Sequence, residues 1–170
     1  MDRGSIVPLN RDFIGRSVAS SVPFEVTRGD IRRFAASLGD ANPAYRDVAA
    51  AQALGYADVI APPTFLITAS TASGGASDLV SDPALGLDYT LVVHGEQKFE
   101  FHRPIQAGDV LDSVTTIADI RDAGRNELML LVTELTSSGE KVATVSNTIV
   151  SRGTAATRTT APRTAPSQES

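Results

Sequence analysis

The second half of the chain contains four long segments, each long enough to form a strand and each bounded by residues that favour turns. They cover residues 91–104, 110–122, 127–137 and 141–151. In the third segment both sets of alternate residues are largely apolar, so both faces of this strand are expected to be covered in part. One face holds Leu128, Leu130, Val132 and Glu134, and the other holds Met129, Leu131, Thr133 and Leu135. Because the connecting turns are short, the pattern predicts an antiparallel sheet.

The first half of the chain predicts one short strand and then a helix. The strand is expected around residues 22–26. Thr27 and Asp30 follow with the spacing of a capping-box variant, which predicts a helix start. An apolar stripe with helical spacing then runs to Gly39, a residue suited to the position just after a helix. The stripe consists of Ile31, Phe34, Ala35 and Leu38. Asp40 therefore begins a loop.

Two more helices are expected before the sheet. Asp47 can cap a short helix that runs to Ala53. After the pair Pro62-Pro63, residues 64–76 predict a largely buried helix with small side chains in its second half, followed by a loop over residues 77–88. Small side chains fit either a tightly wrapped sheet or a ligand groove. The fold class is therefore α+β, an antiparallel sheet around a central buried helix.

Composition limits the class of protein. With 170 residues, of which 42% are hydrophobic, the chain can bury one full core and is expected to form one domain. No apolar run is long enough to cross a membrane, and the polar first residues lack a signal-peptide core, so a cytoplasmic protein is expected. The absence of cysteine and the presence of only two histidines argue against disulfides, thiolate nucleophiles and a transition-metal site.

Charge separates the body of the chain from its tail. The net charge is −5, and the last nineteen residues, Arg152 to Ser170, carry three Arg and one Glu, so the rest carries −7. An acidic body argues against binding to nucleic acid. Because the tail lacks a periodic apolar face, we expect a domain over residues 1–151 and a disordered tail over residues 152–170.

The stretch Gly39-Asp40-Ala41-Asn42-Pro43-Ala44-Tyr45 is the most informative motif in the sequence. Three further segments follow it in order, at residues 61–65, 93–101 and 103–109. Together they resemble the MaoC-like (R)-specific enoyl-thioester hydratase and dehydratase family, and within it the N-terminal-type, HadA-like branch of FAS1-type dehydratases. The resemblance covers roughly Phe13 to Ser151 and implies a single hotdog fold.

The family implies reversible syn addition of water to a trans-2-enoyl thioester, or loss of water from a (3R)-3-hydroxyacyl thioester. Active members use an aspartate and a histidine five positions later to move protons and water. A glycine N–H at the start of the central helix holds the thioester oxygen as it gains charge. By this resemblance, Asp40 occupies the aspartate position and Asn42 that of a loop asparagine. Both residue types also suit a helix-terminating turn, and both interpretations stay open.

Two positions depart from the pattern of active members. Tyr45 occupies the histidine position, and a phenol with a pKa near 10 stays protonated at neutral pH and does not cycle as imidazole does. Tyr45 can also simply pack against the loop. Pro63 falls where active members have the glycine, and proline has no N–H, although the Thr64 N–H could substitute. A Pro-Pro pair is equally explained as a rigid helix start.

The resemblance thus gives two sets of candidate site residues. The candidate catalytic residues are Asp40, Asn42, Tyr45 and His94, and the candidate substrate-binding residues are Pro63, Thr64 and Phe65. His94 is included for an altered proton relay, although a histidine on a strand, such as His94 or His102, is usually structural.

The favoured hypothesis is a non-catalytic subunit that accommodates the acyl chain in a (3R)-hydroxyacyl-thioester dehydratase, beside a second hotdog chain that has both Asp and His. A long sheet edge favours such a heterodimer, or a homodimer. Two alternatives stay open: a self-sufficient hydratase or dehydratase acting on a fatty-acyl or polyketide thioester, and a homodimeric module that binds an acyl thioester without turnover. The carrier can be coenzyme A or acyl carrier protein. No cofactor, metal, nucleic acid or membrane is expected.

Overall fold

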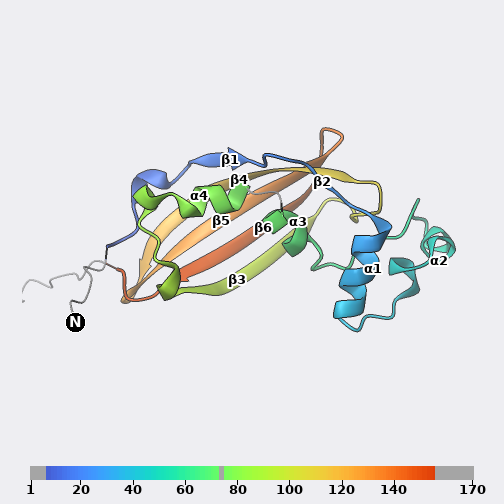
Figure 1. Ribbon diagram of the computed structural model, residues 1–170, viewed down its shortest axis with the longest axis horizontal. Coiled ribbons are helices and arrows are strands. Elements are labelled where there is room, and N and C mark those ends of the chain that lie inside the picture. The colour runs from blue at the N-terminus through green and yellow to red at the C-terminus, as the bar shows by residue number, and fades with distance from the viewer. Residues whose placement is uncertain (1–6, 73–74, 156–170) are drawn as a thin grey trace, which may run out of the picture.

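One antiparallel sheet dominates the molecule, as the computed structural model shows for residues 7–72 and 75–155 (Figure 1). Its strand order is β1-β4-β5-β6-β3, and β2 also pairs with β4. The strands are β1 (Ser17–Ala19), β2 (Phe24–Glu25), β3 (Val92–Phe101), β4 (Val110–Ala123), β5 (Asn126–Ser137) and β6 (Glu140–Ser151). Helices α3 and α4 lie over one face of the sheet, and α1 and α2 lie beyond one end of it (Figure 1). This is the expected hotdog architecture.

The four long strands agree closely with the sequence prediction because the turns between them are fixed locally. Gly124 and Gly139 have φ of +64° and +79°, a conformation that side chains disfavour, at the turns between β4 and β5 and between β5 and β6. The short predicted strand at residues 22–26 is reduced to Phe24–Glu25, because Pro23 has no N–H to donate to the sheet. Strand β1 was not predicted.

The first two helices begin where the sequence places their caps. Helix α1 (Arg28–Ser37) starts at Thr27, whose hydroxyl accepts the Asp30 N–H at 3.1 Å, while the Asp30 carboxylate accepts the Thr27 N–H at 3.2 Å. This is a full capping box. Helix α2 (Val48–Ala53) starts at Asp47, whose carboxylate accepts the Ala50 N–H at 3.0 Å.

The central helical region is longer and starts later than predicted. Instead of one helix over residues 64–76, the structure has α3 (Leu66–Ala72) and α4 (Gly75–Ser81), with residues 73–74 outside the described part. The predicted loop from Ser77 is therefore helical up to Ser81. Helix α4 ends before Asp82-Pro83, where the Asp82 carboxylate accepts the Ala84 N–H and starts a 3-10 turn. The 3-10 turns are η1 (Arg11–Phe13), η2 (Pro43–Tyr45), η3 (Pro83–Leu85) and η4 (Tyr89–Leu91).

Two apolar clusters fill the space between the helices and the sheet. The first contains Leu66 and Ala69 of α3 with Leu135 and Val145 of the sheet. The second contains Leu79 of α4 with sheet residues that include Met129 and Leu131. We call the face of the sheet that carries these residues the inner face. Alternate residues of β5 on the other face are half-buried, so both faces are covered in part, as predicted.

The chain continues in contact with the sheet beyond the predicted domain end at Ser151. The Gly153 N–H donates to the Asn126 side-chain oxygen of β5 at 3.0 Å, and Thr154 is buried. The predicted disordered tail stays a prediction, because residues 156–170 lie outside the described residues. Within residues 7–72 and 75–155, no helix is long and apolar enough to cross a membrane.

Candidate functional site

A pocket of about 380 Å³ brings two of the predicted site residues together. It is lined by Tyr45, Ile60, Ala61 and Pro63 from the first half of the chain and by residues 101–105 from the second. Most of these side chains are apolar, and the polar groups among them are the Tyr45 hydroxyl, His102 and Arg103. A separate hollow of about 420 Å³ beside Phe13 and Leu79 contains none of the predicted site residues. We therefore treat the pocket at Tyr45 as the candidate site.

Backbone hydrogen bonds hold the walls of this pocket together. The Ala61 N–H donates to the Ile105 carbonyl at 2.7 Å, and Ile60 forms an isolated bridge with Gln106. The Ile60 N–H also donates to the Ala44 carbonyl at 3.1 Å. The extended segment before α3 is thus fastened both to η2 and to the turn after β3. Tyr45 consequently lies against a turn that is some sixty residues later in the chain.

Asp40 and Asn42 organise the loop that leads into η2. The Asp40 carboxylate accepts the Asn42 N–H at 3.0 Å, and the Asn42 side-chain oxygen accepts the Ala44 N–H at 3.0 Å. Arg46 adds a bond from its guanidinium to the Asp40 carbonyl at 2.7 Å. Both predicted residues therefore make the contacts of a helix-terminating turn. Neither of them lines the pocket.

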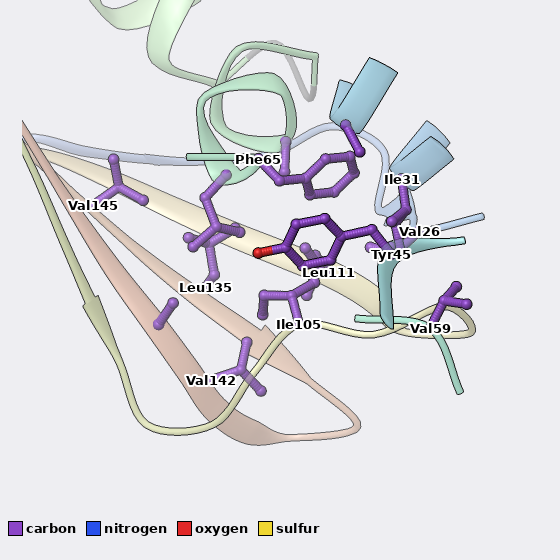
Figure 2. Close-up of a cluster of buried hydrophobic side chains, with 14 residues drawn as sticks. Val26, Ile31, Tyr45, Val59, Phe65, Ile105, Leu111, Leu135, Val142 and Val145 are labelled. Atoms are coloured by element: carbon purple, nitrogen blue, oxygen red, sulfur yellow. The ribbon is translucent and has the colours of Figure 1, made fainter. Parts of the chain in front are cut away.

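Tyr45 is a core residue that also lines the pocket. It is 7% exposed and packs in the first apolar cluster, where its ring lies among Phe65, Ile105 and Leu111 (Figure 2). Within the part of the chain that the structure describes, no hydrogen bond joins its hydroxyl to Asp40 or to another side chain. The carboxylate and the phenol thus do not form a hydrogen-bonded pair in this chain.

The predicted substrate-binding residues separate into different environments. Pro63 is exposed and lines the pocket, and Thr64 is exposed beside it. Phe65 is 1% exposed, and its ring meets that of Phe34 edge to face, with centroids 5.5 Å apart. Helix α3 begins at Leu66, so the two prolines precede its first turn. Among the three residues, Pro63 is the one placed in the pocket wall.

The two histidines of β3 lie at opposite ends of the strand. His94 is exposed and pairs with Ile149, seven residues before Phe101, which corresponds to about 23 Å along an extended strand. It is therefore remote from the pocket of its own chain. His102 lines the pocket, although the sequence analysis did not select it. Its place in the pocket depends on the contact of the turn after β3 with the segment before α3, which the sequence does not reveal.

A buried ion pair fixes the turn that forms the second wall. Asp109 is 6% exposed and accepts two hydrogen bonds from the Arg103 guanidinium, at 2.6 and 2.8 Å. It also accepts the Gln106 N–H at 2.9 Å and the Ser137 hydroxyl at 3.1 Å. Burial by itself would raise the pKa of Asp109, but these hydrogen bonds and the guanidinium charge hold that pKa below its usual range. The same bonds raise the pKa of Arg103.

The pocket can hold an apolar chain and offer it one phenol and one imidazole. It does not contain the aspartate and histidine pair that moves a proton and a water molecule. In the described residues, no three His, Cys, Asp or Glu side chains gather in a way that could hold a metal ion. The geometry therefore suits the binding of an apolar group more directly than acid–base chemistry by an aspartate and histidine pair.

Comparisons with known proteins agree with this architecture. Residues 12–145 match the model of the family described as FAS1-like, dehydratase domain region. A relative from Parafrankia sp. (strain EAN1pec), the UPF0336 protein Franean1_6066, is 55% identical over 153 residues, which is 89% of this chain and all of that protein.

Two solved structures share the fold. One, described as a MaoC-like dehydratase, is 31% identical with a TM-score of 0.75, and the match covers 82% of this chain but only 42% of that longer one. The other is the C-terminally truncated HadBC (3R-hydroxyacyl-ACP dehydratase) complex from Mycobacterium tuberculosis, which is 26% identical with a TM-score of 0.74 over 84% of this chain and 99% of that one. Both carry the MaoC-like hotdog fold that the sequence predicted. With its family model matched over most of its length, this chain belongs to the FAS1-like dehydratase region family of MaoC-like hotdog proteins.

Proposed function

We propose that this chain is a cytoplasmic, non-catalytic subunit that binds the acyl chain in a (3R)-hydroxyacyl-thioester dehydratase or enoyl-thioester hydratase. The observation that carries the proposal is that Tyr45 is buried and forms no hydrogen bond with Asp40. The residue at the histidine position of active members is a buried phenol that has no hydrogen bond to Asp40. A proton relay needs both groups within hydrogen-bond reach of the reacting atoms, and this chain alone does not assemble that pair.

The chemistry of the phenol supports the same proposal. A phenol hydroxyl can donate a hydrogen bond, but it does not take up and release a proton as an imidazole does. The Asp40 Oδ1 accepts the Asn42 N–H, and Asp40 does not line the pocket. Pro63, at the position of the helix-start glycine, has no N–H to offer a thioester oxygen. In this protomer the carboxylate thus lies outside the pocket lining, and the imidazole and the N–H at those two positions are absent.

The pocket at Tyr45 is the proposed place for the acyl chain. Its lining is mainly aliphatic and aromatic, with Ile60, Pro63, Phe101 and Ile105 contributing apolar surface. An acyl chain gains free energy by leaving water for such a surface, at about 0.8 kcal/mol for each buried methylene. We expect an acyl thioester as the ligand, carried by coenzyme A or by acyl carrier protein.

The proposed partner is a second hotdog chain that has both the aspartate and the histidine. Strand β3 is at one end of the strand order, and within the described residues its outer edge pairs with no other strand. Val93 and Phe101 on this strand are each 41% exposed. An unprotected edge of ten residues favours pairing with another strand. The similarity to HadBC, which is a complex, supports a heterodimer, and a homodimer is the second arrangement.

Assays of the isolated chain and of its mixtures with a candidate partner test the proposal. The isolated chain is expected to bind an acyl thioester but not to hydrate a trans-2-enoyl thioester. Activity should appear with the partner and should persist with Asp40→Asn in this chain. Turnover by the isolated chain that disappears with Asp40→Asn would refute the proposal. Saturable binding without turnover in every mixture would instead favour a homodimeric binding module.

One observation favours a self-sufficient enzyme as the second candidate. His102 lines the same pocket as Tyr45, so an imidazole is present there although it comes from β3 and not from the motif loop. His102→Gln separates the two candidates. The substitution should abolish turnover by an isolated enzyme, whereas it should leave the activity of a heterodimer close to its original value if the partner supplies both reacting groups.

A further inference from the structure

A band of polar side chains crosses the inner face of the sheet between the two apolar clusters. Thr115 of β4 and Thr133 of β5 are opposite each other, both buried, with their hydroxyls 2.9 Å apart. Asn147 of β6 is diagonal to Thr133 on the same face, because Thr133 pairs with Val145 and alternate residues share a face. Gln97 of β3 pairs with Asn147 and completes the band at the sheet edge.

The outer half of this band has two amide oxygens without hydrogen-bond donors. The Gln97 side-chain N–H donates to the Ser146 carbonyl at 3.0 Å, which fixes the direction of the amide. Its oxygen and that of Asn147 are both buried, and neither has a donor in the part of the chain that the structure describes. The Thr115 and Thr133 hydroxyls satisfy each other, so within the band the unsatisfied atoms are those of Gln97 and Asn147. Ser151 Oγ, at the end of β6, is a further buried atom without a partner in the described residues. Buried acceptors without a donor are rare in folded proteins because they destabilise them.

Gln97 and Asn147 lie on the same face of the sheet as Phe101, which lines the pocket at Tyr45. Phe101, Phe99 and Gln97 follow one another on the inner face of β3, and Phe101 lines the pocket. The rings of Phe99 and Phe101 are stacked, with centroids 6.4 Å apart. Gln97 is four residues from Phe101, which corresponds to about 13 Å along the strand. The pocket lining ends at Phe101 and both amide oxygens are buried, so an acyl chain that continued from the pocket along β3 would meet them once the Phe99 and Phe101 rings moved aside.

We propose that Gln97 and Asn147 form a subsite that accepts a hydrogen bond from a hydroxyl group on the acyl chain, so that the substrate is an oxygenated, polyketide-type chain. The inference rests on the proposed acyl-binding function. The two free atoms are neutral acceptors, so the complementary group is a neutral donor. A plain alkyl chain would leave both acceptors unsatisfied, whereas a hydroxyl would satisfy one or both. A site built to bond a hydroxyl discriminates against the analogue that lacks it, by roughly tenfold or more.

Binding of non-hydrolysable acyl-pantetheine thioethers tests the subsite. The series contains one plain alkyl chain, chains of the same length with a hydroxyl at successive carbons, and pantetheine without an acyl group. The full-length protein, alone and with its partner subunit, should bind one hydroxylated analogue at least about tenfold more tightly than the plain one. Asn147→Leu and Gln97→Met should remove that difference while the plain analogue binds as well as before. Thr144→Val, on the other face of β6, is the matched control and should keep the preference.

Thermal unfolding of the same variants gives a second and ligand-free readout. Because an apolar side chain removes an unsatisfied buried acceptor, Asn147→Leu should keep or raise the Tm. Equal affinity of the unmodified protein for plain and hydroxylated chains would overturn the subsite, as would a clear fall in Tm, which would assign the amide a structural role. If the variants bound pantetheine without an acyl group more weakly, the subsite would also be overturned. The two amides would then accept hydrogen bonds from the pantetheine arm and not from the acyl chain. If no acyl analogue binds at all, the proposed function itself fails.

Discussion

Asp109→Asn is expected to destabilise the protein strongly, because Asp109 organises the turn that forms one wall of the pocket. Its buried carboxylate accepts hydrogen bonds from the Arg103 guanidinium, the Gln106 N–H and the Ser137 hydroxyl. An asparagine has one acceptor oxygen and no charge, so the substitution leaves Arg103 with only the exposed Glu140 carboxylate at 4.0 Å and at least one donor without a partner. The Arg103 side chain is 28% exposed and can regain only part of this stabilisation from water.

Removing one partner of a buried ion pair costs about 3–5 kcal/mol, and we expect about 2–3 kcal/mol here because Arg103 is partly solvated. With a urea m-value of roughly 2 kcal/mol/M, the midpoint of urea unfolding should fall by about 1 M without a change in m. Glu134→Gln is the matched control, since it removes the carboxylate of the exposed pair with Lys141. Exposed pairs contribute less than about 1 kcal/mol, so this control should remain near the original midpoint.

The pH dependence of the free energy of unfolding provides a second test of the Asp109–Arg103 ion pair. The pKa of Asp109 is lower in the folded protein than its unfolded value of about 3.9, so the folded state favours the ionised carboxylate. The resulting stabilisation is fully present above pH of about 4 and is lost as the pH falls below it. The free-energy difference between the original protein and Asp109→Asn should therefore shrink on acidification. A midpoint shift no larger than that of Glu134→Gln, or a difference unchanged at about pH 3, would refute this reasoning.

Three further predictions concern the caps, the sheet and the motif loop. Thr27→Ala removes the capping hydroxyl of α1 and should lower the free energy of unfolding by about 1 kcal/mol in urea titrations. Gly95→Ala should lower the free energy of unfolding by about 1–3 kcal/mol, because an added Cβ would lie 2.9 Å from a Val150 methyl and 3.1 Å from the Thr148 carbonyl. Gly29→Ala in α1 is the control: its Cβ would meet only side-chain atoms, so this substitution should be neutral or stabilising. Tyr45→His should lower the Tm and give no hydratase turnover by the isolated chain, because Pro63 still offers no N–H, and turnover would show that the imidazole is the only group the isolated chain lacks.

The sheet could be predicted from the sequence because residues close together in the chain determine its strands and turns. Strand lengths follow from the apolar segments, and glycines such as Gly124 and Gly139 fix the turns between them. The same holds for α1 and α2, whose caps Thr27 and Asp47 are the predicted ones. The central helical region was less predictable, because residues 77–81 have the composition of a loop and become helical where α4 can pack Leu79 against the sheet.

The candidate site was only partly predictable, because its walls meet through long-range contacts. The motif loop identified Tyr45 and the segment at residues 61–65 identified Pro63, and the resemblance gave both a place in a reaction. It gave no sign that His102 would lie beside them, since that contact depends on the bonds between Ala61 and Ile105 and between Ile60 and Ala44. The pairing of Gln97 with Asn147 could not be predicted either, because it depends on the register of β3 against β6.

The burial of Tyr45 links the proposed lack of catalytic chemistry to the stability of the fold. In an acid–base site, the residue at this position must exchange protons with a substrate, which favours a polar and partly hydrated imidazole. Here the same position supplies an aromatic ring to the first apolar cluster, next to Phe65 and Ile105 (Figure 2). A histidine at position 45 would leave part of that volume empty and place a polar ring among aliphatic side chains, at a cost of roughly 2–4 kcal/mol. Restoring the imidazole would therefore destabilise the protomer without supplying an N–H at Pro63, which supports the proposal that a partner chain provides both reacting groups.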